Sequence, residues 1–203
     1  MTKVKSSISV TADNCLAGHG MTEAKPFGDF PHEELLHGWM FADPAKHKYE
    51  REEIVNAGAF IMGRNMFGPR GAEYDRTWQG WWGEEPPYHG PVFVLTHRER
   101  EPIELKGGTT FHFVTDGIES ALKQARAAAG ERDVSICGGA ETVNQYLAAG
   151  LLDELWLHVV PYVFGDGKRL FEGVSRVGLK VLDVRSTPEV THMRYGVKRV
   201  HPR

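Results

Sequence analysis

The chain is poor in the features that mark secreted, membrane and nucleic-acid-binding proteins. Its 203 residues include only two cysteines, too few for a disulfide framework, so we expect Cys15 and Cys137 to be reduced core thiols. No apolar run reaches the roughly 18 residues of a membrane-spanning helix, and the opening MTKVKSSISV lacks a signal-peptide core. A net charge of −3 disfavours nucleic-acid binding. We therefore expect a cytoplasmic protein with neither a membrane nor a nucleic-acid partner.

The common cofactor and catalytic motifs are missing as well. GRNMFG at 63–68 has the glycine spacing of a P-loop, but Pro69 and Arg70 stand where Lys and Ser or Thr belong. The chain contains no G-x-G-x-x-G, HExxH or G-x-S-x-G sequence. Its ten histidines show no spacing typical of a metal site. We therefore expect most histidines to lie at the surface and no metal to be bound.

What remains is an ordinary globular composition, 41% hydrophobic and 25% charged, that fits one domain over residues 1–203. Apolar runs predict strands at 3–11, near 60, 92–96, 111–114, 134–137, 154–160, 179–186 and 190–200. Helical spacing predicts helices at 32–40, 49–56, from the cap Asp116 with Glu119 to the stop Gly130, and at 140–149. This alternation predicts a three-layer α/β/α sandwich. Its central sheet is mostly parallel, covered on both faces, with an antiparallel C-terminal hairpin around 187–189.

The strand at 134–137 is followed by Gly138-Gly139 and immediately by a helix. A glycine pair lets backbone N–H groups approach a phosphate closely, and the start of a helix adds a partial positive charge. A nucleotide pyrophosphate would fit such a turn. A tight strand–helix turn without a ligand would also explain it.

Two further strand ends carry chemistry that suits a phosphate. The strand near 60 leads into Gly63-Arg64-Asn65-Met66, where Arg64 could direct two donors at one phosphate. The strand at 92–96 ends in Thr96-His97-Arg98, which could instead be a solvated charged turn. Because parallel strands end at one edge of a sheet, the three junctions predict a crevice for one extended ligand.

These segments together resemble the dihydrofolate reductase-like superfamily, most closely its branch similar to the RibD C-terminal domain, the reductase of bacterial riboflavin synthesis. The resemblance rests on TADNCLAG (11–18), FIMGRNMF (60–67), VFVLTHR (92–98) and ICGGAETVNQYLAAGLLDELWLHVVPYVFGDGKRLF (136–171). It implies an NADPH-dependent oxidoreductase that transfers a hydride to a small heterocyclic or carbonyl substrate. The nearest activity is 5-amino-6-(5-phosphoribosylamino)uracil reductase. A dihydrofolate or pterin reductase, a non-catalytic NADPH-binding protein and a flavin-binding oxidoreductase are the alternatives.

The resemblance also assigns residues to the cofactor. They are Thr11, Leu16, Ala17, Gly63, Arg64, Asn65, Met66, Thr96, His97, Arg98, Cys137, Gly138, Gly139, Ala140, Glu141 and Thr142. Asp13 falls on the family's acidic position, and Asn14 stands where a glycine is usual. Burial would raise the pKa of the Asp13 carboxyl and let it supply or relay a proton, so Asp13 is the catalytic candidate. An Asx-turn at Asn14-Cys15 is the alternative role.

Aromatic residues suit a flat heterocyclic substrate. We expect Trp39, Met40 and Phe41 to form one wall of the substrate pocket. The resemblance places the loop that begins at Phe164 at the same end of the sheet, where Lys168 and Arg169 could meet a substrate phosphate or be simple surface cations. The tryptophans of the loop predicted at 69–90, Trp78, Trp81 and Trp82, could contact the substrate or cover an interface. Such aromatic-rich segments favour a homodimer.

Overall fold

The computed structural model describes residues 2–30, 33–69, 71 and 74–198. The strands are β1 (Val4–Thr11), β2 (Cys15–Ala17), β3 (Ala59–Gly63), β4 (Pro91–Leu95), β5 (Ile103–Glu104), β6 (Thr110–Val114), β7 (Val134–Gly138), β8 (Glu154–Val160), β9 (Lys168–Arg169), β10 (Gly178–Ser186) and β11 (Thr191–Lys198). The helices are α1 (Glu33–His37), α2 (Trp39–Ala42), α3 (Lys48–Val55), α4 (Arg64–Phe67), α5 (Tyr74–Thr77), α6 (Ile118–Ala129) and α7 (Ala140–Ala148), with a 3-10 turn at Lys106–Gly108. No helix among these residues is long and apolar enough to cross a membrane.

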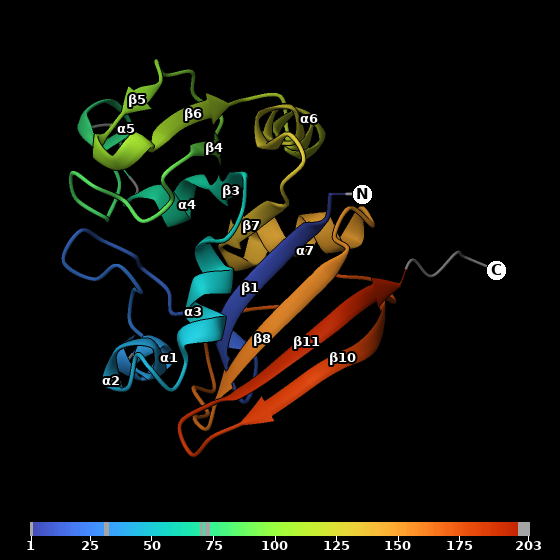
Figure 1. Cartoon of the computed structure of the whole chain (residues 1–203). Helices are drawn as coiled ribbons and strands as arrows, with labels where there is room; N and C mark the ends of the chain where they lie inside the picture. Colours follow the sequence, from blue (N-terminus) through green and yellow to red (C-terminus); the bar gives the residue numbers. More distant parts are fainter. Residues whose placement is uncertain (1, 31–32, 70, 72–73, 199–203) are drawn as a thin grey trace.

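A nine-stranded sheet in the order β10-β11-β8-β1-β7-β3-β4-β6-β5 forms the centre of the molecule (Figure 1). The six strands from β8 to β6 run parallel to one another. β11 pairs antiparallel with β8 and with β10, and β5 pairs antiparallel with β6. The predicted mostly parallel sheet with an antiparallel C-terminal hairpin is confirmed.

Helices lie on both sides of this sheet, as the three-layer prediction requires. Because side chains alternate along a strand, β1 presents two different faces. Ile8 and Val10 join the core that α6 and α7 cover. Ser7 and Ser9 lie on the other face, under α1 to α3, where Trp39 of α2 donates a hydrogen bond to Ser9. One face of β1 is therefore apolar and the other polar, although both are buried.

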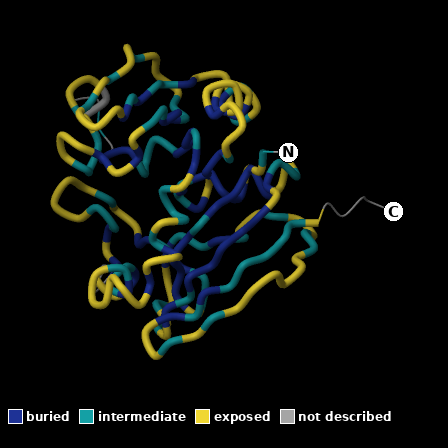
Figure 2. Tube along the Cα trace, viewed as in Figure 1, coloured by how far each residue is buried: buried dark blue, intermediate teal, exposed yellow. Residues whose placement is uncertain are grey.

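The C-terminal hairpin does not follow the prediction that both faces of the sheet are covered. Most residues of β10 are exposed, among them Leu179, Val181, Leu182 and Val184 (Figure 2). The expectation that both faces of the whole sheet are covered is therefore wrong at this edge. β11 is described as far as Lys198, so residues 199–200 of the predicted strand lie outside the described part of the chain.

Three local predictions also differ from the structure. The helix expected at 32–40 is divided at Gly38 into α1 and α2, a break that glycine favours, and its first residue, His32, is not among those described. The loop expected at 69–90 contains the short helix α5. Asp116 does not cap α6, because Gly117, with φ of 87°, takes the cap position one residue later. Gly130 ends that helix as predicted.

The tryptophan-rich segment packs against the sheet. Trp78 donates to the carbonyl oxygen of Phe67, and Trp82 stacks on Phe111 of β6. Both belong to the side chains around the second apolar core, with Tyr88. These two tryptophans therefore cover the sheet, and four of the exposed large apolar side chains, Leu179, Val181, Leu182 and Val184, lie on β10.

Candidate active site

Four strands that carry predicted site residues are neighbours in the sheet, in the order β1-β7-β3-β4. All four run parallel, so their carboxyl ends share one edge. At a spacing of roughly 4.8 Å between strands, this row spans about 14 Å. The structure thus brings Asp13, the Gly138-Gly139 turn, the Gly63-Arg64 turn and the Thr96-Arg98 segment to one edge, as the sequence predicted.

The glycine turn after β7 leaves space beside the start of α7. A Cβ placed on Gly139 would meet no atom within 4 Å, so this backbone borders open space. The peptide bond between Gly138 and Gly139 is cis. Thr142 N–H donates to the carbonyl oxygen of Gly139 (3.1 Å), and the N–H groups of Gly139, Ala140 and Glu141 before it lie next to this opening. The site is therefore compatible with a phosphate group, as the sequence suggested.

The second glycine turn is packed against the first. A Cβ on Gly63 would lie 2.4 Å from the side-chain oxygen of Thr142 in α7, so only glycine allows this approach. Arg64, however, directs its two terminal nitrogens at the carbonyl oxygens of Gly68 (2.9 Å) and Pro69 (2.8 Å). The guanidinium that was expected to bind a phosphate therefore holds the loop that follows α4. Arg64 has a structural role in this conformation.

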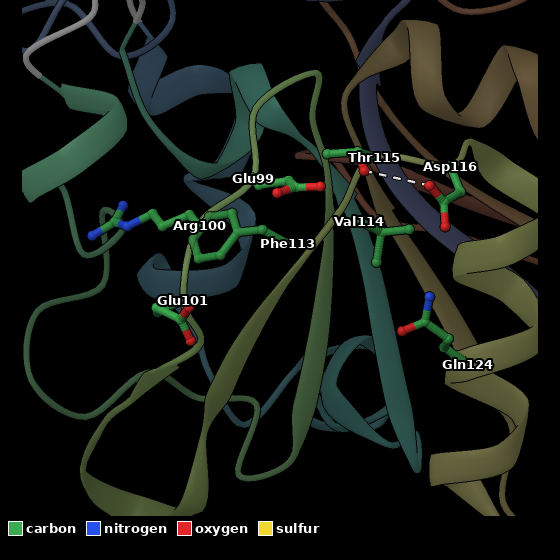
Figure 3. Close-up of a pocket in the computed structure, with 8 residues that line it drawn as sticks. All are labelled: Glu99, Arg100, Glu101, Phe113, Val114, Thr115, Asp116 and Gln124. Atoms are coloured by element: carbon green, nitrogen blue, oxygen red, sulfur yellow. Dashed lines mark hydrogen bonds between the residues drawn. The ribbon is translucent and has the colours of Figure 1, made fainter.

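The third junction lies at the open end of β4. His97 and Arg98 are exposed, and the backbone N–H of Arg98 donates to Thr96. A neighbouring hollow is lined by three acidic residues, Glu99, Glu101 and Asp116, and by Phe113 with Arg100 over its ring (Figure 3). Three carboxylates disfavour a phosphate inside this hollow. A phosphate at this edge would therefore fit better at His97 and Arg98.

Asp13 is held by several donors. Its carboxylate accepts hydrogen bonds from the Thr11 hydroxyl (2.6 Å), from Phe164 N–H (3.1 Å) and from Gly165 N–H (2.8 Å). Burial alone would raise its pKa, but the hydrogen bonds from Thr11, Gly165 and Phe164 outweigh burial and hold the pKa well below its usual range. The expected raised pKa is therefore wrong. The alternative Asx-turn is not what holds Asp13 either, since Cys15 N–H donates to Thr11.

The residues around Asp13 build a rigid turn. Thr11 is fully buried, with its hydroxyl between Asp13 and Cys15 and its carbonyl oxygen accepting from Asn14 N–H, so it presents no surface to a cofactor in this conformation. Asn14 adopts the left-handed conformation, with φ of 64°, as expected for a residue in a glycine position. Leu16 packs against the main core and Ala17 is buried in β2. Of the other cofactor candidates, Cys137 is a neutral thiol, because burial raises its pKa to about 12.

Trp39 and Phe41 do not form the predicted wall of a substrate pocket. Trp39 is 2% exposed and packs inside the protein, whereas Phe41 is 71% exposed. Phe164 lies beside Asp13 and packs on Phe30, with ring centroids 4.5 Å apart. Lys168 lies 3.7 Å from Glu141 at the edge of a hollow along α7. Among these four, Phe164 is the residue next to the acid.

Sequence reasoning missed a partner of Asp13. Arg169 of β9 lies 3.6 Å from the carboxylate and donates to the carbonyl oxygen of Gly165. The short pairing of β9 with β2 brings it there, and two-residue strands leave no periodic signal in the sequence.

A group of buried histidines was also missed. His47, His158 and His192 are buried beneath Trp39, so the expectation that most histidines lie at the surface fails for these three. Their signal was present as polar residues within apolar strands, at His158 in β8 and His192 in β11. Linear spacing could not detect it, because the three residues come together only through the sheet.

The sheet order and the row of strand ends define an α/β domain of the dihydrofolate reductase-like type. Residues 2–193 match the family model described as the RibD C-terminal domain, and the chain belongs to this family.

Similar proteins have been described in several bacteria. Uncharacterized protein YyaP of Bacillus subtilis (strain 168) is 33% identical over 108 residues, which cover 51% of this chain and 57% of that protein. A provisional riboflavin biosynthesis protein from Shewanella sp. PV-4 has a TM-score of 0.67 at 20% identity, covering 98% of this chain and all of its own. A Thermotoga maritima diaminohydroxyphosphoribosylaminopyrimidine deaminase/5-amino-6-(5-phosphoribosylamino)uracil reductase has a TM-score of 0.64 at 16% identity, covering 96% and 56%. At these identities the structural likeness concerns the fold.

Proposed function

We propose that the protein is an NADPH-dependent reductase of a small heterocyclic or carbonyl substrate, nearest to a 5-amino-6-(5-phosphoribosylamino)uracil reductase. The observation that carries the proposal is the open Gly139 turn at the start of α7, in one row with Asp13 and the end of β4. Membership of the RibD C-terminal domain family supports it. A dihydrofolate or pterin reductase is the second candidate, and a cytoplasmic location remains a prediction.

Residues of this chain would hold NADPH as follows. Backbone N–H groups of Gly139 to Glu141, with the Thr142 hydroxyl behind them, would bind the pyrophosphate, and His97 with Arg98 would bind the 2′-phosphate. The turn that follows β1, with exposed Ala12 and partly exposed Asp13, Asn14 and Leu16, would border the nicotinamide. When bound, NADPH would supply the hydride. Arg64 would bind a phosphate only after releasing its two carbonyl partners.

Asp13 would hold neighbouring residues in place and would not donate the proton. A carboxylate with a lowered pKa stays ionised at neutral pH and is a poor proton donor. We therefore propose that it fixes Phe164 and Arg169 next to the substrate, and that water supplies the proton. Arg169 and Lys168 would face a substrate phosphate, and Phe164 would face a flat ring.

Calorimetric titration with NADPH and NADH tests the cofactor. We expect a preference for NADPH of about tenfold, equal to about 1.4 kcal/mol, because the 2′-phosphate would meet the guanidinium of Arg98 beside the His97 ring. Arg98→Gln should remove most of this preference, while Arg132→Gln, in the turn before β7 at the opposite end of the strands, should leave it unchanged. Absence of binding to either nucleotide would refute the reductase proposal.

An activity screen separates the enzyme from a binding protein. NADPH consumption would be followed with the phosphoribosylaminouracil, dihydrofolate and simple pterins. Turnover with one of them identifies the reductase, and Asp13→Asn should lower that turnover while the Kd for NADPH stays the same. NADPH binding without turnover of any of these compounds would favour the non-catalytic alternative. A yellow purified protein would favour a flavin enzyme.

We also propose a homodimer, through β10. The side chains of Leu179, Val181 and Val184 lie on one face with their cross-strand partners in β11, and all three are exposed. A second copy that covers this apolar face would remove it from water. Light scattering should give a dimer for the native chain and a monomer for Val181→Lys. A native monomer would contradict the proposal.

A further inference from the structure

We propose that His47, Glu50 and His192 form a binding site for a divalent transition-metal ion such as Zn²⁺, with Arg185 occupying the position of the ion in its absence. The three side chains are buried and come from two elements, the start of α3 and strand β11. One ligand atom of each lies within 4.8 Å of the others. Two histidines and one carboxylate form a ligand set that zinc accepts, with a fourth position left for water.

The distances are close to those that a tetrahedral ion needs. Ligands at 2.0–2.1 Å from zinc lie about 3.3 Å from each other. His47 Nδ1 is 3.0 Å from His192 Nε2, and His192 Nε2 is 4.0 Å from Glu50 Oε1. Shifts of less than an ångström would therefore place all three atoms around one ion.

A cation already links the same atoms. Arg185 Nε donates to Glu50 Oε1 (2.7 Å), and Arg185 Nη2 donates to His47 Nδ1 (3.1 Å). The Arg185 side chain is 39% exposed and belongs to the edge strand β10, so it can turn into solvent without disturbing the core. The ion would thus replace a partly exposed side chain as the partner of the buried Glu50 carboxylate.

The remaining ring nitrogens form a supporting chain. His192 Nδ1 lies 2.7 Å from His158 Nδ1, and His158 Nε2 lies 2.7 Å from Ser7 Oγ. Without metal, the donors of Arg185 make His47 Nδ1 an acceptor, so the chain runs from Ser7 through His158 and His192 to His47. With metal on His192 Nε2, its Nδ1–H donates to His158, and His158 donates to Ser7. Both states satisfy every ring nitrogen of His158 and His192, as ligand-supporting hydrogen bonds should.

Titration of the purified full-length protein with Zn²⁺ and with Co²⁺ tests this site, after removal of any bound metal with a chelator. We expect one equivalent bound, a visible Co²⁺ spectrum typical of low coordination, and a higher melting temperature with Zn²⁺. Glu50→Gln and His192→Gln should lose this binding. His89→Gln, at an exposed histidine outside the cluster, should keep it.

Arg185→Gln gives an independent result, because it removes the competing cation from a partly exposed position. We expect it to bind Zn²⁺ about tenfold more tightly than the native chain. Failure of both the native chain and Arg185→Gln to bind one equivalent would overturn the proposal. Binding that persists in folded Glu50→Gln and His192→Gln would also overturn it and would place the ion on surface histidines. Neither readout depends on NADPH or on turnover.

Discussion

Two polar centres lie on the same face of β1, and they differ in whether their polar groups are charged or neutral. The strand ends at Thr11, and Asp13 follows two residues later. Its charged carboxylate lies near solvent and accepts hydrogen bonds from backbone N–H groups and from the Thr11 hydroxyl. About 7 Å back along the strand, uncharged Ser9 accepts a hydrogen bond from buried Trp39, and partly buried Ser7 is hydrogen-bonded to the fully buried His158. Burial lowers the pKa of His158 there to about 3, so the ring is neutral. The open centre keeps a charge, and the closed centre keeps neutral hydrogen-bonded rings.

The difference indicates which centre can meet a ligand directly. Asp13 and Phe164 border solvent at the edge where the four strands end, so a small molecule can reach them. The histidine cluster is covered by Trp39, and the partly exposed side chain of Arg185 reaches it from the edge strand. We therefore place substrate chemistry at the first centre and an ion, which needs little space, at the second.

The largest effect should come from Trp39→Ala. Trp39 packs on the rings of His47, His158 and His192, and its removal leaves a cavity that we expect to cost about 3–5 kcal/mol of unfolding free energy. Phe41→Ala is the matched control, because Phe41 is exposed and should cost less than about 0.5 kcal/mol. Urea unfolding measures both. Equal small losses would mean that Trp39 is a surface residue of the substrate pocket, as its sequence context suggested.

The next effect should come from His158→Leu. Without the ring, the Ser7 hydroxyl and His192 Nδ1 each lose a buried partner, and we expect a cost of about 2–3 kcal/mol. In a double-mutant cycle with Ser7→Ala, the coupling should be about 1 kcal/mol. His112→Leu provides the comparison, since that ring is half-buried and stacks on Phe93. Were His158→Leu no more costly than His112→Leu, the hydrogen-bonded chain would contribute nothing to stability.

Asp13→Asn should have a smaller effect that depends on pH. At pH 7 the amide retains only part of the carboxylate's hydrogen bonds, and we expect a loss of about 1–2 kcal/mol. The pKa of Asp13 is lowered in the folded state, so its stabilisation is complete above the unfolded pKa of about 3.9 and is lost as the pH falls below it. Unfolding at about pH 7, 5 and 3 should show the difference shrinking only at the last value.

Asp116→Asn controls for this measurement, because exposed Asp116 has only a 3.4 Å contact to Thr115. It should change stability by less than about 0.5 kcal/mol at every pH. A pH-independent loss in Asp13→Asn would show that shape rather than charge holds the turn.

The sheet edge that carries Asp13 could be predicted from the sequence, whereas the buried histidine cluster could not. The difference has a physical reason. Gly138-Gly139, Gly63 and Asp13 each follow a strand whose apolar pattern is strong, and parallel strands bring such ends together whatever their order. The histidine cluster depends on β8 and β11 being neighbours and on α3 crossing them. Neither fact has a local signature. The engagement of Arg64 by Gly68 and Pro69 likewise depends on the exact path of a loop.

The same limit explains the errors at single side chains. Asp13 and Trp39 both stood beside the predicted pocket in sequence, and both were assigned roles in chemistry. The partners that decide their behaviour come from distant segments, namely Phe164 and Gly165 for the carboxylate and His158 and His192 for the indole. A pattern can place a residue at a strand end, while its protonation and exposure depend on contacts across the fold.

The smallest effect is expected at Glu141, a second carboxylate at the open edge. It lies in the first turn of α7, beside the Gly139 opening, and its charge is partly offset by Lys168 at 3.7 Å. Under the proposed function, this charge repels the pyrophosphate that the helix start attracts. Glu141→Gln should therefore tighten NADPH binding about two- to threefold, roughly 0.5 kcal/mol for an exposed charge, and less at high salt. Weaker binding in this variant would instead mean that Lys168 needs Glu141 to hold it near the nucleotide.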